Sequence, residues 1–188
     1  MIRQATARDA DHLTRFVNMA SDNLSLHFWK RSVGPTGDAW AYGRDRAARD
    51  SGNFSYSNAW LAEDQGEVAA CLLGYPVDDP APIDEGTPPI FVPLLELEAL
   101  APGSWYLNVL ATYEGHRGKG LGSALLAKAE DVAHAAGHRT ISLIAEDTHQ
   151  DALRLYRANG YQEVARRPVV KGDWQVDASE WILFVKPL

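Results

Sequence analysis

The sequence predicts an α/β fold in which helices cover both faces of a mixed sheet. The chain has 188 residues and is 46% hydrophobic, which is enough to bury a core of its own. In its second half, short apolar segments typical of strands alternate with longer segments of helical periodicity. At roughly 150 residues per domain the length favours one domain, which we expect to span residues 1–188.

A short strand and a helix are expected first. The opening residues have strand composition, and Thr6 and Asp9 have the spacing of a capping box, which predicts a helix start. Apolar residues then recur at three- and four-residue intervals as far as Ala20, so this helix has one apolar face. Residues 21–56 are aromatic and irregular, with one further helix expected around residues 39–50.

Two strands and a loop occupy the middle of the chain. The segments AWLAE and EVAACLLGY have strand composition, with a turn at residues 64–66 between them. Residues 76–89 are dense in proline and acidic side chains, which predicts a surface loop flanked by core strands.

The second half continues as alternating strands and helices. Four strands and two helices are expected. Their order is the strand SWYLNVLAT, the helix Leu121–Ala136, the strand TISLIAE, a helix from Thr148 through Tyr156, and the strands GYQEVARR and WILFVK. Gly137 ends the longer helix, and Thr148 and Asp151 have the spacing of a second capping box.

Charge and cysteine content exclude several classes of function. The chain carries 18 basic and 25 acidic residues, a net charge of −7, which disfavours nucleic acid as a partner. Cys71 is the single cysteine, so there is no intramolecular disulfide or multi-cysteine metal site. His134 and His138 lie on either side of Gly137, so we expect no metal. No apolar run reaches the roughly 20 residues that cross a bilayer, and the polar N-terminus does not resemble a signal peptide. We therefore expect a cytoplasmic protein with no membrane partner.

The most informative segment is Leu110–Ser123, which places several glycines between a strand and a helix. Backbone N–H groups and the positive end of the helix dipole favour an anion there, and Arg117 and Lys119 add positive charge. Glycine allows the backbone to approach a phosphate closely. The alternative is an ordinary glycine-rich turn with solvated basic residues.

Two common phosphate motifs do not fit this segment. A dinucleotide fingerprint requires glycine where Ser123 or Leu125 stands, depending on its starting glycine. A nucleotide P-loop requires lysine where Leu121 stands.

The pattern Arg117-x-x-Gly120-x-Gly122 resembles the pyrophosphate loop of the GCN5-related N-acetyltransferases, the GNAT superfamily. Downstream residues are similar to the same family: Ala152, Leu155, Tyr156, Asn159, Gly160 and Tyr161. The chain departs from the family at His149, where asparagine is usual, and at Glu114, where proline is frequent. The resemblance covers residues 58–188 well.

The resemblance implies a GNAT-type fold, with a mixed, mostly antiparallel sheet whose central strands splay apart to bind acetyl-CoA as cosubstrate. Main-chain groups of Leu110, Ala111 and Thr112 would then contact the pantetheine arm and the thioester. The pyrophosphate would be held by Arg117, Gly118, Lys119, Gly120, Leu121, Gly122 and Ser123. His149 would take the place of the usual asparagine beside the pantetheine arm.

The resemblance also implies catalytic roles. Tyr156 stands where many members have the tyrosine that protonates the coenzyme sulfur, although a core tyrosine fits the same spacing. In LLELEAL, Glu96 and Glu98 alternate with leucines, which predicts that both carboxylates point to one face. Either is a candidate general base, with Glu98 ahead and Glu96 as an acceptor contact; solvated edge carboxylates are the alternative. Asn108 would orient the acceptor or a water molecule.

The implied reaction is direct transfer of an acetyl group from acetyl-CoA to an amine-bearing acceptor within a ternary complex. Trp29 is expected to line the acceptor pocket, with core packing as the alternative. The acidic loop would suit a cationic acceptor, though solvation explains its charge equally well. A homodimer is one assembly that the resemblance allows. The second functional class is a noncatalytic acyl-CoA-binding sensor or scaffold module of the same fold.

Overall fold

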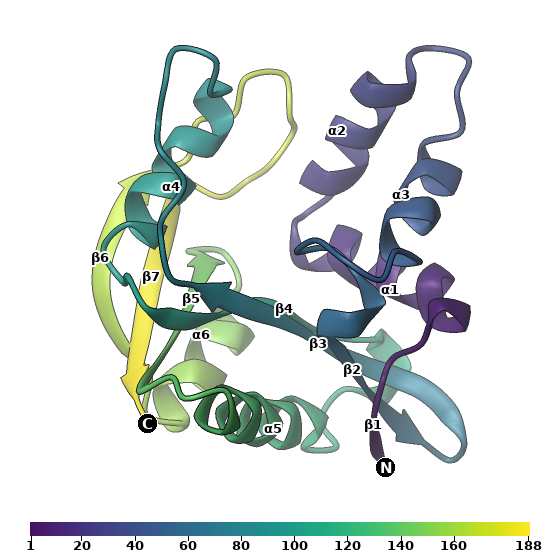
Figure 1. The fold of residues 1–188 in the computed structure, drawn as a ribbon, viewed down its shortest axis with the longest axis vertical. Helices are drawn as coiled ribbons and strands as arrows, with labels where there is room; N and C mark the ends of the chain where they lie inside the picture. The colour runs from purple at the N-terminus through teal and green to yellow at the C-terminus, as the bar shows by residue number, and fades with distance from the viewer. The chain divides into compact units, whose positions relative to one another are not determined.

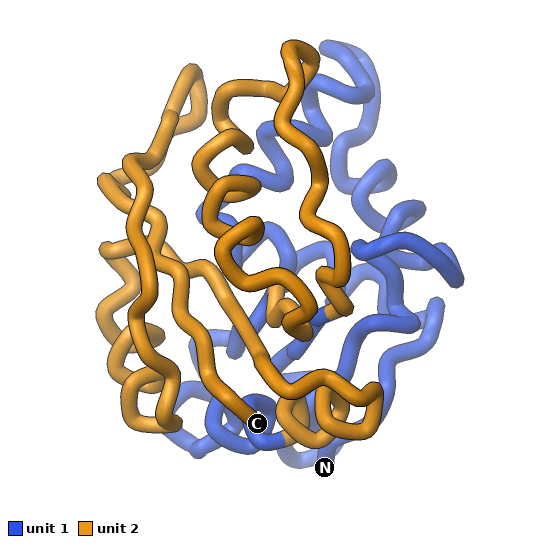
Figure 2. The backbone as a smooth tube through the Cα atoms, turned by 60° about the vertical axis from the view of Figure 1, so that its left-hand side comes forward, with its two compact units in different colours: residues 1–74, 109–127 blue, residues 75–108, 128–188 orange.

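The computed structural model describes residues 1–188 and divides into two compact units (Figure 2). Unit 1 comprises residues 1–74 and 109–127, and unit 2 comprises residues 75–108 and 128–188. The chain therefore passes from one unit to the other within two strands and one helix.

Seven strands and six α-helices make up the fold (Figure 1). The strands are β1 (Ile2–Gln4), β2 (Ala59–Asp64), β3 (Glu67–Val77), β4 (Ser104–Thr112), β5 (Thr140–Glu146), β6 (Gln162–Pro168) and β7 (Glu180–Pro187). The helices are α1 (Ala10–Ala20), α2 (Leu24–Val33), α3 (Ala39–Ala47), α4 (Val92–Glu98), α5 (Leu121–Ala135) and α6 (Gln150–Ala158).

The strands form one mixed sheet in the order β1-β2-β3-β4-β5-β7-β6. β4 and β5 run parallel, whereas the β1–β2, β2–β3, β5–β7 and β6–β7 pairs are antiparallel. The predicted α/β class and the mostly antiparallel sheet are therefore confirmed. None of the helices is both long enough and apolar enough to span a bilayer.

In unit 1, an ion-pair cluster ties the N-terminal strand to the start of α1. The Asp9 carboxylate accepts hydrogen bonds from the Thr6 backbone N–H and hydroxyl at 2.8 and 2.9 Å, as the capping-box pattern predicts. Arg3 donates to Asp9 at 2.8 Å and, through Nε, to Glu63 on β2 at 2.6 Å. The guanidinium, together with the Thr6 donors, lowers the pKa of Asp9 from 3.8 to about 2. The cluster therefore fixes β1 and the start of α1 to β2.

The three N-terminal helices of unit 1 pack on one another, which requires a small residue on α3. A Cβ at Gly43 would lie 2.7 Å from the Trp29 ring on α2. The expected helix at residues 39–50 is confirmed, ending at Ala47. The irregular structure expected before it is wrong in part, because Leu24–Val33 is helical. In this segment Leu24, Leu26 and Phe28 alternate with polar residues, which is the spacing of a strand rather than of a helix.

In unit 2, α4 packs against β6 and β7. The prediction that Glu96 and Glu98 lie on one face is wrong, because both belong to this helix rather than to an extended segment. Residues two apart on a helix point about 200° apart. Pro93 stands in the first turn of α4, where its fixed backbone angle favours a helix start. The alternation of leucine and glutamate was too short to distinguish a helix from a strand.

The central strands part within unit 2. β4 pairs with β5 from Trp105–Leu107 to Ile141–Leu143, and the parallel ladder ends there. β5 nevertheless continues to Glu146 and pairs over those last residues with β7 on its other side. Near the start of the paired segment, buried Ser104 and Ser142 hydroxyls hydrogen-bond at 2.7 Å. Within unit 2 the β4–β5 ladder therefore ends before β5 does, which agrees with the splayed central strands that the resemblance implies.

Candidate functional site

The glycine-rich loop of unit 1 connects β4 to α5. Leu110, Ala111 and Thr112 are the last residues of β4 and are half-buried. Tyr113 follows, and its ring stacks on Phe16 of α1 with 4.2 Å between the ring centroids. Its backbone N–H donates a 2.9 Å hydrogen bond to the Ala69 carbonyl oxygen of β3. These contacts hold the start of the loop against the body of unit 1.

Two glycines give the loop its path. Gly118 and Gly120 have φ angles of +73° and +77°, a region that favours glycine. A Cβ at either position would meet no other atom within 4 Å. The conformation, rather than crowding within the protein, therefore requires glycine, and the surface above both residues is open to a ligand.

The N-terminus of α5 follows directly and has the properties of an anion site. The first hydrogen bond recorded there runs from the Ala124 N–H to the Gly120 carbonyl at 3.1 Å. The N–H groups of Leu121, Gly122 and Ser123 precede it and have no acceptor within the helix. The first turn holds no acidic residue. A phosphate group therefore fits this terminus by charge and by hydrogen bonding.

The cations of the loop differ in their surroundings. Arg117 is exposed and donates weakly, at 3.4 Å, to the Thr112 carbonyl oxygen. Lys119 donates through Nζ to Oδ2 of Asp64 at 2.5 Å, and His116 donates through Nδ1 to the same oxygen at 2.9 Å. Hydrogen bonds from Lys119 first, and then from His116, lower the pKa of Asp64. The sequence did not predict the contact of Asp64 with His116, because the sequence around Asp64 indicates only a turn.

Trp29, expected in the acceptor pocket, lies in the core of unit 1 with 5% exposure. Its ring stacks on Phe54 at 5.9 Å and meets Trp40 edge-on at 6.1 Å. These contacts agree with core packing, which was the alternative to a role of Trp29 in the acceptor pocket. Trp40 also lines a surface groove of about 510 Å³ together with Leu26, His27, Lys30, Arg31, Gly34, Pro35, Gly37, Asp38 and Ala39.

In unit 2, Tyr156 lies on the inner side of α6 with 6% exposure. Its ring packs against Phe184 of β7 at 5.9 Å and Tyr161 at 6.0 Å. Burial raises the pKa of the Tyr156 phenol to about 12. The hydroxyl therefore keeps its proton at neutral pH, as a proton donor to a thiolate must.

The two glutamates of α4 have different environments. Arg167 of β6 donates through Nε to Oε2 of Glu96 at 2.6 Å, so Glu96 is ion-paired. Glu98 is half-buried, and burial raises its pKa to about 6. A carboxylate with this pKa is mostly ionised at neutral pH and more basic than an ordinary glutamate, as a general base requires.

Tyr106 is a further buried residue of unit 2, and the sequence did not predict it as a site residue. It lies on β4 with 5% exposure, and its ring meets Tyr75 edge-on at 5.7 Å. Burial raises the pKa of Tyr106 well above 10, and the charge of Glu98 adds to the rise. A hydrogen bond with Asn108 acts in the opposite direction, and Tyr156 raises the pKa further. Since Tyr106 and Asn108 are two apart on one strand, their shared face was a usable signal. The predicted base, acid and amide of unit 2 thus all affect the pKa of Tyr106.

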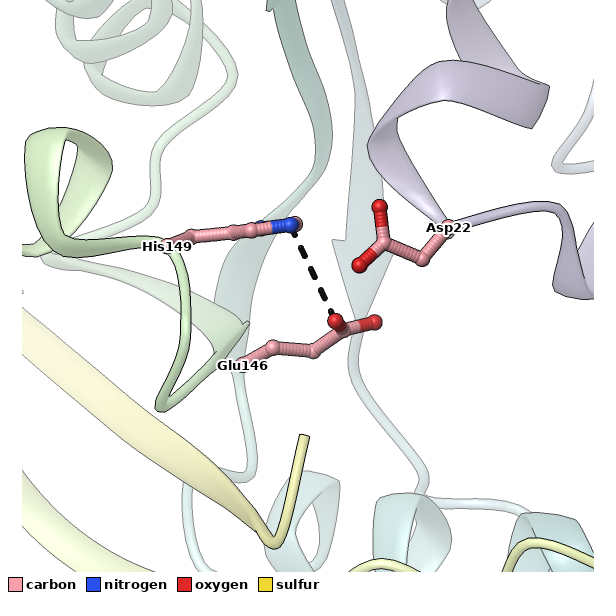
Figure 3. A group of neighbouring side chains, drawn as sticks. All are labelled: Asp22, Glu146 and His149. Carbon is pink, nitrogen blue, oxygen red and sulfur yellow. Dashed lines mark ion pairs between the residues drawn. The ribbon is translucent and has the colours of Figure 1, made fainter. Parts of the chain in front are cut away.

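His149 immediately precedes α6, at the end of the turn after β5. Its Nε2 lies 3.7 Å from Oε2 of Glu146, the last residue of β5 (Figure 3). The Glu146 side chain is 1% exposed, whereas that of His149 is 35% exposed. The imidazole is therefore oriented by a buried carboxylate and remains accessible.

The chain is similar in sequence and in structure to known acetyltransferases. "N-acetyltransferase 8" of Mus musculus is 30% identical over 132 residues, which are 70% of this chain, and the chain spans about half the length of that relative (50%). A Drosophila melanogaster polyamine N-acetyltransferase structure has a TM-score of 0.65 at 16% identity, covering 100% of this chain and 99% of that one. A GNAT acetyltransferase from Elizabethkingia anophelis with acetyl-CoA bound has a TM-score of 0.55 at 15% identity, covering 93% and 89%.

Both structures share the fold described above. Residues 7–161 also match the family described as "Acetyltransferase (GNAT) family". This range contains the glycine-rich loop together with Glu98 and Tyr156. The chain belongs to the GNAT acetyltransferase family.

Proposed function

We propose that the protein is an N-acetyltransferase that moves an acetyl group from acetyl-CoA directly to a primary amine within a ternary complex. The observation that carries the proposal is the loop between β4 and α5, where Gly118 and Gly120 adopt positive φ ahead of an acid-free helix N-terminus. Family membership supports the same activity. Residues 1–188 would act as one catalytic domain.

The residues of this loop fit the pyrophosphate of acetyl-CoA. Open space at Gly118 and Gly120 allows the phosphates to approach the backbone. The N–H groups of Leu121–Ser123 would donate to phosphate oxygens, and Arg117 and Lys119 would supply charge. Main-chain groups of residues 110–112 would hold the pantetheine arm, and the resemblance implies His149 as a further contact of that arm.

The chemistry begins at the acceptor amine. Glu98 would remove a proton from the ammonium, directly or through water, and the free amine would attack the thioester carbon. The carbon–oxygen π electrons move to oxygen in the tetrahedral intermediate, and a backbone N–H near the end of β4 would stabilise that charge. Collapse of the intermediate breaks the carbon–sulfur bond, and Tyr156 would give its proton to the departing thiolate. The acylated nitrogen loses its extra proton to solvent, and solvent returns a proton to the Tyr156 tyrosinate. Asn108 would orient the amine or the bridging water.

An amine acceptor agrees with the family relatives. The Drosophila enzyme is described as a polyamine N-acetyltransferase that forms N-acetylagmatine. Aspartates and glutamates of the loop at residues 78–85 would attract such a cation. We infer a primary amine as the acceptor class on this basis.

A second candidate function is a noncatalytic acyl-CoA-binding module. His149 favours it, because it replaces the asparagine usual in the family and is held by Glu146 at 3.7 Å. Altered contact with the pantetheine arm would suit binding without turnover.

Thiol release from acetyl-CoA distinguishes the two candidates. We expect thiol release that depends on both acetyl-CoA and an added amine, with an acetylated amine as the second product by mass spectrometry. The panel should contain polyamines, agmatine and peptides with free N-termini or lysines. Saturable acetyl-CoA binding without release on any amine would support the module instead.

A further inference from the structure

Asp64 lies beside the glycine-rich loop although the chain separates them by about fifty residues. It is the last residue of β2, and the tight turn after it contains Gln65 at φ +53° and Gly66 at φ +86°. One oxygen of its carboxylate, Oδ2, accepts hydrogen bonds from both Lys119 and His116. A single carboxylate oxygen therefore holds two basic side chains of the loop.

A phosphate would compete with this carboxylate. Both groups accept hydrogen bonds from an ammonium through anionic oxygens, and Lys119 lies between Gly118 and Gly120 in the loop proposed to bind pyrophosphate. The ion pair is accessible, since the side chains of Asp64 and Lys119 are 22% and 45% exposed. Accessible ion pairs are weak, so an incoming phosphate can displace the carboxylate.

We propose, on the basis of the proposed function, that Asp64 is an internal competitor for the phosphates of the coenzyme. In the free protein Asp64 binds Lys119, and coenzyme binding transfers the lysine from the carboxylate to a phosphate oxygen. No covalent bond changes; one ion pair replaces another. Asp64 thereby weakens coenzyme binding and favours release of the CoA product.

The test is the dissociation constant of CoA measured by calorimetry for wild type, Asp64→Asn and Glu67→Gln at low ionic strength. Glu67 is the matched control, because it is the exposed residue that pairs with Asp64 across the hairpin and has no recorded bond to the loop. We expect D64N to bind CoA about two- to fivefold more tightly than wild type, and E67Q to change affinity much less. High salt should reduce the difference.

A double mutant identifies Lys119 as the group released. In a Lys119→Met background, the D64N substitution should lose most of its effect, because no ammonium remains to transfer. A D64N gain that persists unchanged in K119M would overturn the proposal. Weaker or equal binding by D64N would overturn it too, showing that Asp64 positions the loop or is inert. Failure of wild type to bind CoA at all would overturn the proposed function together with this proposal.

Discussion

Arg167 on β6 donates a 2.6 Å hydrogen bond to Glu96 on α4, and this pair distinguishes the two glutamates of that helix. Glu96 forms an ion pair with the guanidinium. Glu98 is half-buried, and this burial raises its pKa. The raised pKa of Glu98 therefore supports this residue as the candidate general base.

The Glu98 assignment predicts a pH profile. The base must be ionised, so kcat/KM should rise with pH through about 6, the pKa of Glu98, and then level off until the acceptor titrates. Glu98→Gln should lower kcat by about 100-fold and abolish this limb. Glu96→Gln is the control from the same helix and should retain the limb. A limb near pH 6 that survives in E98Q would remove Glu98 from the mechanism.

The Tyr156 assignment predicts a selective loss of turnover. Tyr156→Phe should lower kcat by about 100-fold, since a general acid contributes at least that much, while the dissociation constant for CoA stays unchanged. Tyr161→Phe is a matched control, because Tyr161 is an equally buried neighbour whose hydroxyl has no hydrogen-bond partner. Removing that hydroxyl should leave both turnover and stability nearly unchanged. Unchanged turnover in Y156F would assign Tyr156 to the core alone.

The loop glycines predict a difference between two similar substitutions. Gly120→Ala and Gly52→Ala each place alanine at positive φ, +77° and +87°, with no atom within 4 Å of the new Cβ. Both should lower the free energy of unfolding by about 1 kcal/mol. Only G120A should also weaken CoA binding, by about tenfold, since it alters the backbone beside the phosphates. Calorimetry and thermal unfolding measure the two effects, and equal CoA affinity in both variants would argue against the loop.

The Arg3–Asp9 pair predicts acid-dependent stability. The folded-state pKa of Asp9 is lowered from 3.8 to about 2, so its contribution is present above pH 3.8 and is lost as pH falls through 2. The shift corresponds to about 2 kcal/mol at neutral pH. Asp9→Ala should lower the free energy of unfolding by at least this amount at pH 7, and denaturant titrations should show the difference from wild type shrinking over that pH window. A constant difference down to pH 2 would contradict this account.

Local patterns in the sequence were sufficient to predict the loop and most strands. The run from Arg117 to Gly122 carries its own structural information, because positive φ and a helix start are properties of adjacent residues. The same holds for the capping box at Thr6 and Asp9. These features do not depend on distant parts of the chain.

Partners distant in the sequence could not be predicted. Glu96 and Arg167 are 71 positions apart, and Asp64 and Lys119 are 55 apart, so only the folded chain brings each pair together. The helix containing Glu98 was missed for a different reason, since seven residues give too little periodicity to distinguish it from a strand. The role of Glu98 as general base therefore stays a prediction, and the structure places this residue on a helix rather than on an extended segment.

Thermal unfolding with and without acetyl-CoA tests most directly the central claim, that this chain binds the coenzyme at its β4–α5 loop. A ligand at 100 times its dissociation constant stabilises the native state by about 2.7 kcal/mol, which for a chain of this length raises Tm by about 5–10 °C. We predict such a rise for wild type and for G52A, and a smaller one for G120A at the same concentration. No rise in Tm for wild type at millimolar acetyl-CoA would contradict the claim.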